Sequence, residues 1–306
     1  MKNKTLLLAL VVMMLWGSLY PTVKLGYSAY GVKSTADILL FAGIRFTVCG
    51  IIIALISLKR DVKCYSNVKG VIFPILLSGL VAIVLHYGFN YVGLNYTDSS
   101  KAALLKQVGA LLYVCFSFVF IKDDKPSAKK IISAILGFMG IIALNVTPGG
   151  ITFDIGDVLI LCASFCTIFS NVISKKIFAT TDPITATGIS QFFGGAVLVI
   201  IGKITGGSVK FAFDLSLWVI FYVCFASVLS YCIWYSILKK GELSRLFIIK
   251  FSESVFACII GAMLLGEDVF NLRYLVAFIL IGGGIAFSNM RKSLKSEKSV
   301  KNGTES

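Results

Sequence analysis

Charged side chains inside apolar segments are the residues of this sequence best suited to bind a ligand or transfer a proton. The segment KFSESVFACIIGAMLLGED, residues 250–268, places Lys250 and Glu253 in an otherwise apolar run. Lys106 stands in a second apolar run and has no acidic residue within four positions. A charge at the centre of a bilayer costs about 2.5 to 3.5 kcal/mol on insertion scales, so such residues face a protein interior or a wet cavity. The three charges therefore predict a polar site enclosed by helices.

Lys250 and Glu253 are three residues apart, and this spacing leaves two interpretations open. They can form a structural ion pair on one helix, or Glu253 can pair with either lysine until a substrate anion displaces it. In the second interpretation Glu253 then binds the amino group of the substrate or takes a proton. Nearby cations and desolvation act on a carboxyl group in opposite directions, so the sequence leaves proton coupling open.

Polar side chains at helical spacing extend the candidate site. Tyr113 lies seven residues after Lys106 and falls on the same helix face. His86, the single histidine of the chain, lies one helical turn before Asn90. His86 can be a buried residue that hydrogen-bonds to a neighbour, or it can carry protons.

The remaining candidates are one cation, one amide and several aromatic residues. Arg45, about eight residues into its apolar segment, can bind an anion or extend its guanidinium to the membrane surface. Gln191 stands opposite Arg45 in the internal repeat described below. The aromatic candidates can line a site or simply pack between helices, and they are Trp16, Tyr231 and Trp234.

The composition identifies the environment of these residues as a membrane. The 306 residues are 57% hydrophobic and 14% charged, and the mean hydropathy is +0.90. Soluble domains are roughly 45 to 50% apolar and about 25% charged. Spans of about 20 apolar residues cross a hydrocarbon core of about 30 Å. We expect ten such spans, at residues 5–26, 37–58, 71–92, 102–121, 131–147, 157–176, 184–205, 216–238, 246–265 and 272–290.

The positive charges are unevenly distributed between the predicted connections. Of 29 Lys and Arg residues, 20 fall on the side that holds both termini and 5 on the other side. The positive-inside rule therefore predicts a multi-pass protein of the cell membrane with both termini in the cytoplasm. This distribution accounts for the net charge of +14 without nucleic acid as a partner. Residues 291–306 are expected to form a basic, disordered cytoplasmic tail near anionic lipid.

The sequence repeats itself with a shift of 144 residues. This shift aligns Lys106 with Lys250, and Asn145 with Asn289. We therefore expect a first repeat at residues 1–147 and a second at 148–290, with five spans each. Because five is odd, the second repeat enters the membrane from the opposite side. The predicted fold class is an all-α integral membrane protein with ten transmembrane helices in two inverted repeats.

Four segments in this order carry a family resemblance: LWGSLYPTVK, GIRF, FNYVGLNYTDSSKAALL and GAMLLGE. With the repeat, they resemble the EamA-like members of the drug/metabolite transporter superfamily over residues 5–290. The resemblance implies carriage of a small polar metabolite, often an amino acid or related compound and often outward. The sequence departs from the family at about Ala110 and Ser254, where a proline is common. The bending of these two helices is therefore left open, with Gly109, Ser252 and Ser254 as residues that can loosen the backbone.

These observations predict a secondary transporter that exports an amino acid or related metabolite by alternating access around a central cavity. An organic-anion or phosphorylated-metabolite carrier is the alternative favoured by Lys106, Lys250 and Arg45. Efflux of lipophilic cations is the alternative favoured by Glu253 and the aromatic residues. The sequence has no Walker A string, metal triad or activated nucleophile, so we expect neither an enzyme nor a cofactor. The expected partners are the substrate, membrane lipids and, as an open alternative, protons; the sequence leaves the oligomeric state open.

Overall fold

The computed structural model describes residues 3–60, 65, 68–115, 128–147, 149–210, 217–238 and 249–302. Its helices are α1 (Asn3–Ala29), α2 (Thr35–Arg60), α3 (Val68–Gly79), the π-helical η2 (Leu80–Leu85), α4 (His86–Tyr96), α5 (Ser99–Cys115), α7 (Ala128–Leu144), α8 (Ile155–Phe178), α9 (Pro183–Ile204), α10 (Leu217–Leu238), α12 (Ser252–Leu265) and α13 (Leu272–Asn302). The short strands β1 (Val146–Thr147) and β2 (Gly150–Ile151) form an antiparallel hairpin between α7 and α8.

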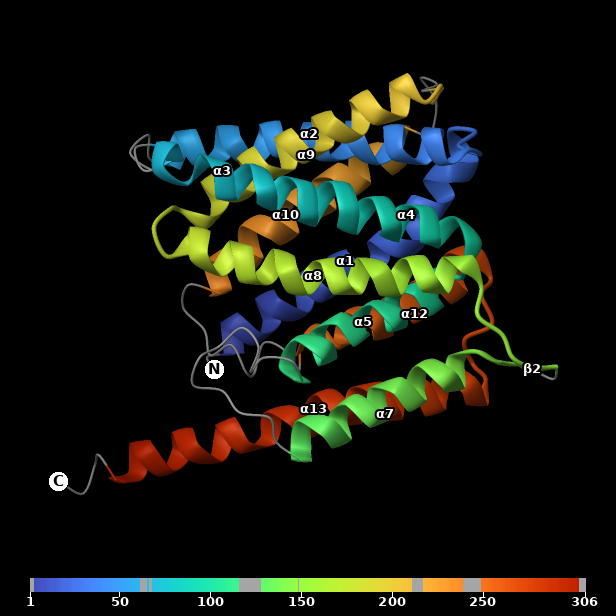
Figure 1. The fold of residues 1–306 in the computed structure, drawn as a ribbon, viewed down its shortest axis with the longest axis vertical. Helices are drawn as coiled ribbons and strands as arrows, with labels where there is room; N and C mark the ends of the chain where they lie inside the picture. Colours follow the sequence, from blue (N-terminus) through green and yellow to red (C-terminus); the bar gives the residue numbers. More distant parts are fainter. Residues whose placement is uncertain are drawn as a thin grey trace.

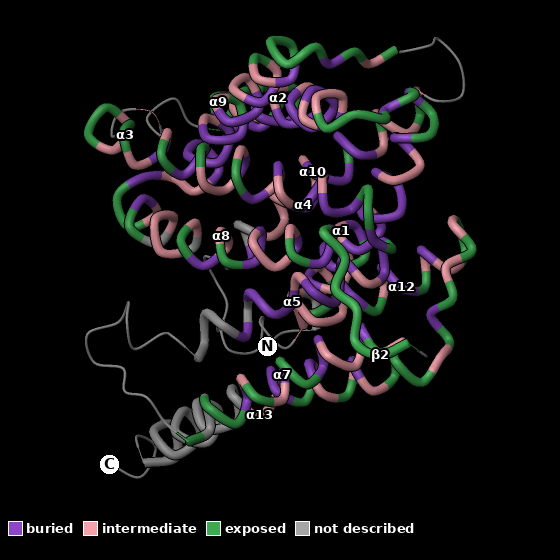
Figure 2. Tube along the Cα trace, turned by 45° about the vertical axis from the view of Figure 1, so that its right-hand side comes forward, coloured by how far each residue is buried: buried purple, intermediate pink, exposed green. Residues whose placement is uncertain are grey.

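The helices have the length and surface of membrane spans. In the part of the chain that the structure describes, six helices are long and apolar enough to cross a membrane, and three shorter apolar helices accompany them. Large apolar side chains face outward on many of them: Phe73 is 74% exposed, Trp218 is 66% exposed and Met263 is 78% exposed. Figure 2 shows exposed residues on the outer faces of the helices and buried residues between them. The predicted all-α integral membrane class is confirmed, whereas the count of ten spans stays a prediction.

Two predicted boundaries differ from the structure. The predicted fifth span extends to residue 147, but α7 ends at Leu144 because β1 pairs with β2 in the register Val146 to Ile151. Residues 291–302, predicted to be disordered, continue α13 as a helix. This basic segment contains several Lys residues and no proline, and Lys is a good helix former.

The helices run side by side, with α2 and α9 at one flank and α7 and α13 at the other (Figure 1). Between the flanks lie α1, α4, α5, α8, α10 and α12. Both termini lie at one end of the bundle, and the β-hairpin lies at the opposite end. We call this opposite end the hairpin end. The central helices are therefore shielded from the surroundings on two sides.

Glycines allow α2 and α9 to approach each other closely. A Cβ atom at Gly43 of α2 would lie 2.5 Å from Val199 N of α9, and one at Gly202 of α9 would lie 2.7 Å from Leu40 N. Only the missing side chain permits such contact between backbones, as is typical of helices in membranes. This flank is accordingly a closely packed support for the central helices.

Candidate functional site

A locally tightened turn of the predicted ninth span lies between its two charges. Residues 249 and 250 are helical, Phe251 forms a turn, and α12 begins at Ser252. The Ser254 N–H donates to Phe251 O at 3.1 Å, a three-residue spacing that is tighter than an α-helical turn. Lys250 and Glu253 therefore lie on either side of this tightened turn.

The charged centre of the site joins three helices. Lys106 Nζ of α5 lies 3.7 Å from Glu253 Oε1 of α12. The hydroxyl of Tyr20, on α1, donates to the same Oε1 at 3.4 Å. Lys106 Nζ also lies 5.3 Å from the centroid of the Tyr20 ring. The Glu253 side chain is only 2% exposed, so the ion pair stands in a largely dehydrated environment.

The acid of this centre pairs across helices and not within its own helix. Among the ion pairs of the described residues, Glu253 pairs with Lys106, and Lys250 has no carboxylate within 4.0 Å. A structural Lys250–Glu253 pair, the simpler of the two expectations from sequence, is therefore not what the structure contains. Lys250 Nζ lies 5.9 Å from the centroid of the Trp16 ring instead.

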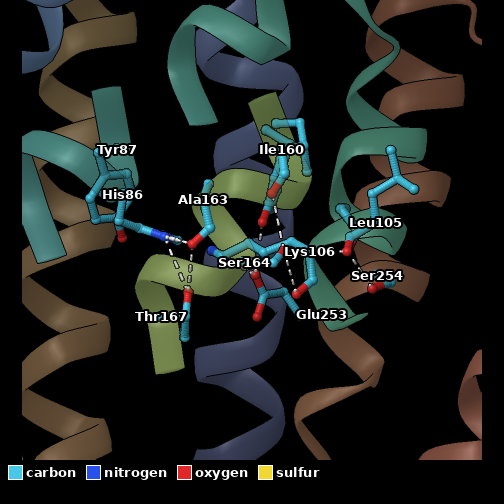
Figure 3. A network of polar contacts seen from close by, with 12 residues as sticks. His86, Tyr87, Leu105, Lys106, Ile160, Ala163, Ser164, Thr167, Glu253 and Ser254 are labelled. Atoms are coloured by element: carbon cyan, nitrogen blue, oxygen red, sulfur yellow. Dashed lines mark hydrogen bonds and ion pairs between the residues drawn. The ribbon is translucent and has the colours of Figure 1, made fainter. Parts of the chain in front are cut away.

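Close backbone contacts hold these side chains in place. Ser164 Oγ of α8 lies 3.4 Å from the carbonyl oxygen of Lys106, and Ser254 Oγ of α12 donates to Ala103 O of α5 at 3.0 Å (Figure 3). A Cβ atom at Gly17 of α1 would lie 2.5 Å from the carbonyl oxygen of Glu253. The glycine after Trp16 thus allows α1 to lie directly against the residue that carries the acid.

Aromatic side chains from three helices form one group beside the charges. The Trp16 ring lies 5.8 Å from the ring of Tyr231 and 5.3 Å from that of Trp234, both on α10. The hydroxyls of Tyr231 and Tyr87 lie 2.9 Å apart. The Tyr87 ring centroid in turn lies 5.9 Å from Lys106 Nζ. The structure therefore brings the predicted aromatic residues together and links them to the charged centre.

His86 connects the site to α8. Its Nδ1 lies 2.7 Å from Ala163 O and 3.1 Å from Thr167 Oγ1, and its ring contacts Tyr87 edge-on (Figure 3). Because the carbonyl oxygen can only accept, the Nδ1–H donates to Ala163 O. The position of His86 directly after the π-helical η2 sets its direction, and such segments are frequent at functional sites.

Arg45 is buried, so of its two predicted alternatives the structure does not contain the one in which the guanidinium extends to the membrane surface. It is 1% exposed, and its Nη2 donates to Ser227 Oγ of α10 at 2.5 Å. Its Cζ lies 4.6 Å from the Phe46 ring centroid, 6.0 Å from that of Tyr87 and 5.5 Å from that of Tyr91. The guanidinium is therefore surrounded by aromatic rings inside the bundle.

Two predicted site residues, Asn90 and Gln191, make no described contact with Lys106 or Glu253. Asn90 is 3% exposed and Gln191 is 1% exposed. Asn90 Oδ1 and Gln191 Oε1 have no hydrogen-bond partner among the described residues. The side chain of Tyr113 lies outside the described part of the chain. Gln191 belongs to α9, on the flank of the bundle.

A second polar cluster closes the hairpin end. Glu267 Oε1 accepts from Ser99 N at 2.7 Å, and Oε2 accepts from Ser100 N at 2.9 Å and from Ser100 Oγ at 2.5 Å. The carboxylate thus caps the positive N-terminal end of α5. Gly266 ends α12 at φ +66°, and a Cβ atom at Gly261 would lie 2.7 Å from Glu267 Oε2. Both glycines of GAMLLGE are therefore needed for this cap.

Lysines extend this cluster to α1 and α8. Lys24 Nζ donates to Thr97 O at 2.8 Å and lies 3.9 Å from Glu267 Oε1. Lys101 Nζ lies 2.8 Å from Asp157 Oδ2 of α8. We call this set of residues the hairpin-end network; it consists of Lys24, Thr97, Ser99, Ser100, Lys101, Asp157 and Glu267. The network ties four separate parts of the chain together.

The prediction from sequence omitted several residues that build the site. Tyr20 lies four residues after Trp16 and so falls on the same helix face, a signal that was present in the sequence. Tyr87 was identifiable only as a neighbour of His86. The contact of His86 with Ala163 uses a backbone carbonyl, which no residue type reveals.

Apolar helices that enclose charged and aromatic side chains define a multi-pass membrane protein of the transporter class. The sequence matches the EamA-like transporter family twice, over residues 3–146 and over residues 154–290. The chain belongs to this family, as the resemblance noted in the sequence implied.

Relatives in bacteria, archaea and plants are similar over much of the chain. The uncharacterized transporter YvbV of Bacillus subtilis is 25% identical over 302 residues, which cover 98% of this chain and 96% of that protein. An uncharacterized transporter of Archaeoglobus fulgidus is 22% identical and covers 92% of this chain and 96% of that protein. A chloroplastic WAT1-related protein of Arabidopsis thaliana is 27% identical and covers 68% of this chain and 53% of that protein.

One solved crystal structure shares the fold. It superposes with a TM-score of 0.66 and covers 94% of this chain and 97% of that chain. Its sequence identity is 17%, so the likeness shows the fold alone.

Proposed function

We propose that this protein is a secondary transporter that exports a small polar metabolite, an amino acid or a related compound, from the cell. The observation that carries the proposal is the buried ion pair between Lys106 and Glu253, 3.7 Å apart and bordered by Tyr20. A buried pair is costly to desolvate. A substrate that carries one negative and one positive group can take the place of Glu253 beside Lys106 and the place of Lys106 beside Glu253.

The mechanism follows from this exchange. In the empty carrier Glu253 pairs with Lys106, as in the structure. The carboxylate of the substrate then binds Lys106, and the freed Glu253 accepts the substrate's amino group. Trp16 and Tyr231 border the same region and provide flat surfaces for the body of the substrate. The proposal assigns the protein no enzymatic reaction.

Alternating access requires two halves that can move against each other. We propose residues 1–147 and 148–290 as these halves. The helix contacts support this division, because α1 packs on α10 and α12 as α8 packs on α4 and α5. In the two proposed repeats α1 corresponds to α8, α10 to the span that contains α4, and α12 to α5. The contacts of α1 in one repeat therefore correspond to the contacts of α8 in the other. The location of both chain ends at one end of the bundle supports termini on the same side of the membrane, and the distribution of positive charge favours the cytoplasmic side.

Counterflow in proteoliposomes tests the proposal. Proteoliposomes are preloaded with one unlabelled compound from a panel of amino acids, sugar phosphates and lipophilic cations. The same compound is then added outside in labelled form, and its uptake is measured. Lys106→Ala and Glu253→Gln should each lower kcat/KM at least about tenfold, equal to about 1.4 kcal/mol, because each leaves a buried charge without its partner. Lys203→Ala and Asp268→Asn change exposed charges and should leave transport unchanged.

Two results would contradict the proposal. Near-normal kinetics in both site variants would remove the ion pair from the transport mechanism. Saturable transport restricted to lipophilic cations would instead assign the protein to drug efflux.

A further inference from the structure

Arg45 carries a buried positive charge that no carboxylate of the described residues balances. Its side chain is 1% exposed, and none of the described ion pairs includes it. Nη2 donates to the hydroxyl of Ser227, whereas Nε has no hydrogen-bond partner among the described residues. The nearby hydroxyl of Tyr91 is also buried without a partner there. The protein thus holds donors here that a ligand can use.

The surrounding rings compensate this charge only in part. A cation over an aromatic ring gains about 0.5 to 2 kcal/mol, whereas the desolvation of a buried ion costs several kcal/mol. A carboxylate can accept two parallel hydrogen bonds from a guanidinium and neutralise it. Arg45 is therefore suited to an anionic group that comes from outside the chain.

Arg45 lies close enough to the Lys106–Glu253 pair to serve the same small molecule. Arg45 Cζ lies 6.0 Å and Lys106 Nζ lies 5.9 Å from the centroid of the Tyr87 ring, so the two cations are at most about 12 Å apart. Lys250 approaches the same aromatic group through Trp16. Among the described residues, three cations thus meet one acid, Glu253. A second carboxylate on the substrate therefore lowers the excess of positive charge that a substrate with one carboxylate leaves.

We propose that Arg45 is a second anion-binding subsite and that the substrate is a small organic diacid. One carboxylate binds Lys106 and the other binds the guanidinium of Arg45, with the hydroxyl of Tyr91 available as an additional donor. This inference rests on the proposed transport function and names its substrate class. In this proposal Arg45 binds the second carboxylate, for which the Lys106–Glu253 pair offers no partner.

Matched pairs of compounds test the subsite. Succinate and succinamate, like glutamate and glutamine, have nearly the same size, but the half-amide lacks one negative charge. Wild-type protein in proteoliposomes should favour the diacid of at least one pair about tenfold to hundredfold in kcat/KM, because charge-assisted hydrogen bonds are the strong ones. Arg45→Gln should remove this preference, because it lowers uptake of the diacid to about that of the half-amide. Arg273→Gln, the same change at an exposed arginine, should keep the preference.

A second variant and a second measurement cover the case in which Arg45→Gln does not fold. Arg45→Lys keeps the charge and loses the bidentate geometry of the guanidinium, so the KM of the diacid should rise more than the KM of the half-amide. In detergent, the diacid should raise the melting temperature of the wild-type protein more than the half-amide does.

Equal transport and equal thermal stabilisation by diacid and half-amide would overturn the subsite while leaving the proposed transport function intact. The same holds if Arg45→Lys shifts the kinetics of both compounds alike. Failure of the proposed function gives a different result, namely no saturable uptake of any anion or amino acid, and that result would overturn both.

Discussion

At the scale of the residue, the distance between α1 and α12 depends on one missing side chain. Trp16 contributes to the aromatic group, and its neighbour Gly17 lies against the backbone of Glu253. The tryptophan-glycine pair therefore combines a large ring beside the site with the smallest residue at the helix contact. A methyl group at Gly17 would force apart the two helices that carry Tyr20 and Glu253.

Gly17→Ala should lower the free energy of unfolding by about 1 to 3 kcal/mol, the usual cost of overpacking, and should reduce transport. The measurement is thermal unfolding in detergent, together with counterflow. Gly283→Ala is the matched control, because a Cβ atom there meets nothing within 4 Å. Alanine is a better helix former than glycine, so the control should gain up to about 1 kcal/mol. Equal effects at both positions would contradict the role of close approach.

The sequence predicted the residues of the site better than their pairing. Lys106, Lys250 and Glu253 were recognisable because charge is rare in apolar segments. The partner of Glu253 was not recognisable, since the packing of α12 against α5 places its carboxylate beside Lys106. The environment of Arg45 depends on rings from α2 and α4, whose mutual position is a property of helix packing.

At the scale of the element, the end of α12 controls the beginning of α5. Gly266 adopts the left-handed conformation, and this turn directs the carboxylate of Glu267 onto the first amides of α5. A favourable charge at a helix N-terminus adds to these hydrogen bonds. The first turn of α5, the helix that carries Lys106, is thus hydrogen-bonded to Glu267, which follows directly after α12, the helix that carries Glu253.

Glu267→Gln should weaken this fastening, because a neutral amide accepts weaker hydrogen bonds from Ser99 and Ser100 and loses its attraction to Lys24. We expect a loss of about 1 to 3 kcal/mol in the free energy of unfolding, measured by thermal denaturation in detergent. Asp268→Asn removes the neighbouring exposed acid and should change stability little. A variant at Glu267 that melts with the wild-type protein would show that the cap is dispensable.

At the scale of the whole molecule, the two ends of the bundle differ in what they contain. One end holds both chain termini, and the other holds the β-hairpin and the hairpin-end network (Figure 1). The sequence predicted most helix positions within a few residues, because apolar length is a local property. It could not predict the hairpin, which replaces the last turn of the expected fifth span.

Reporter fusions test the proposed topology. Green fluorescent protein at the C-terminus should fluoresce, and alkaline phosphatase at the same position should be inactive, because the uneven positive charge predicts that this end lies in the cytoplasm. Alkaline phosphatase inserted at Gly149, within the hairpin, should be active outside. The reverse pattern would invert the orientation of the bundle.

The π-helical turn Leu80–Leu85 lies within a single continuous span and changes the direction of the side chains that follow it. Each residue of a helix advances the direction of its side chain by about 100°, so a widened turn changes the phase of everything that follows it. Before the turn, α3 presents a packing face to α9; after it, α4 presents His86 and its neighbours to α8. The π-helical turn, and not only the spacing of residues in the sequence, therefore determines which polar residues of this span face the interior.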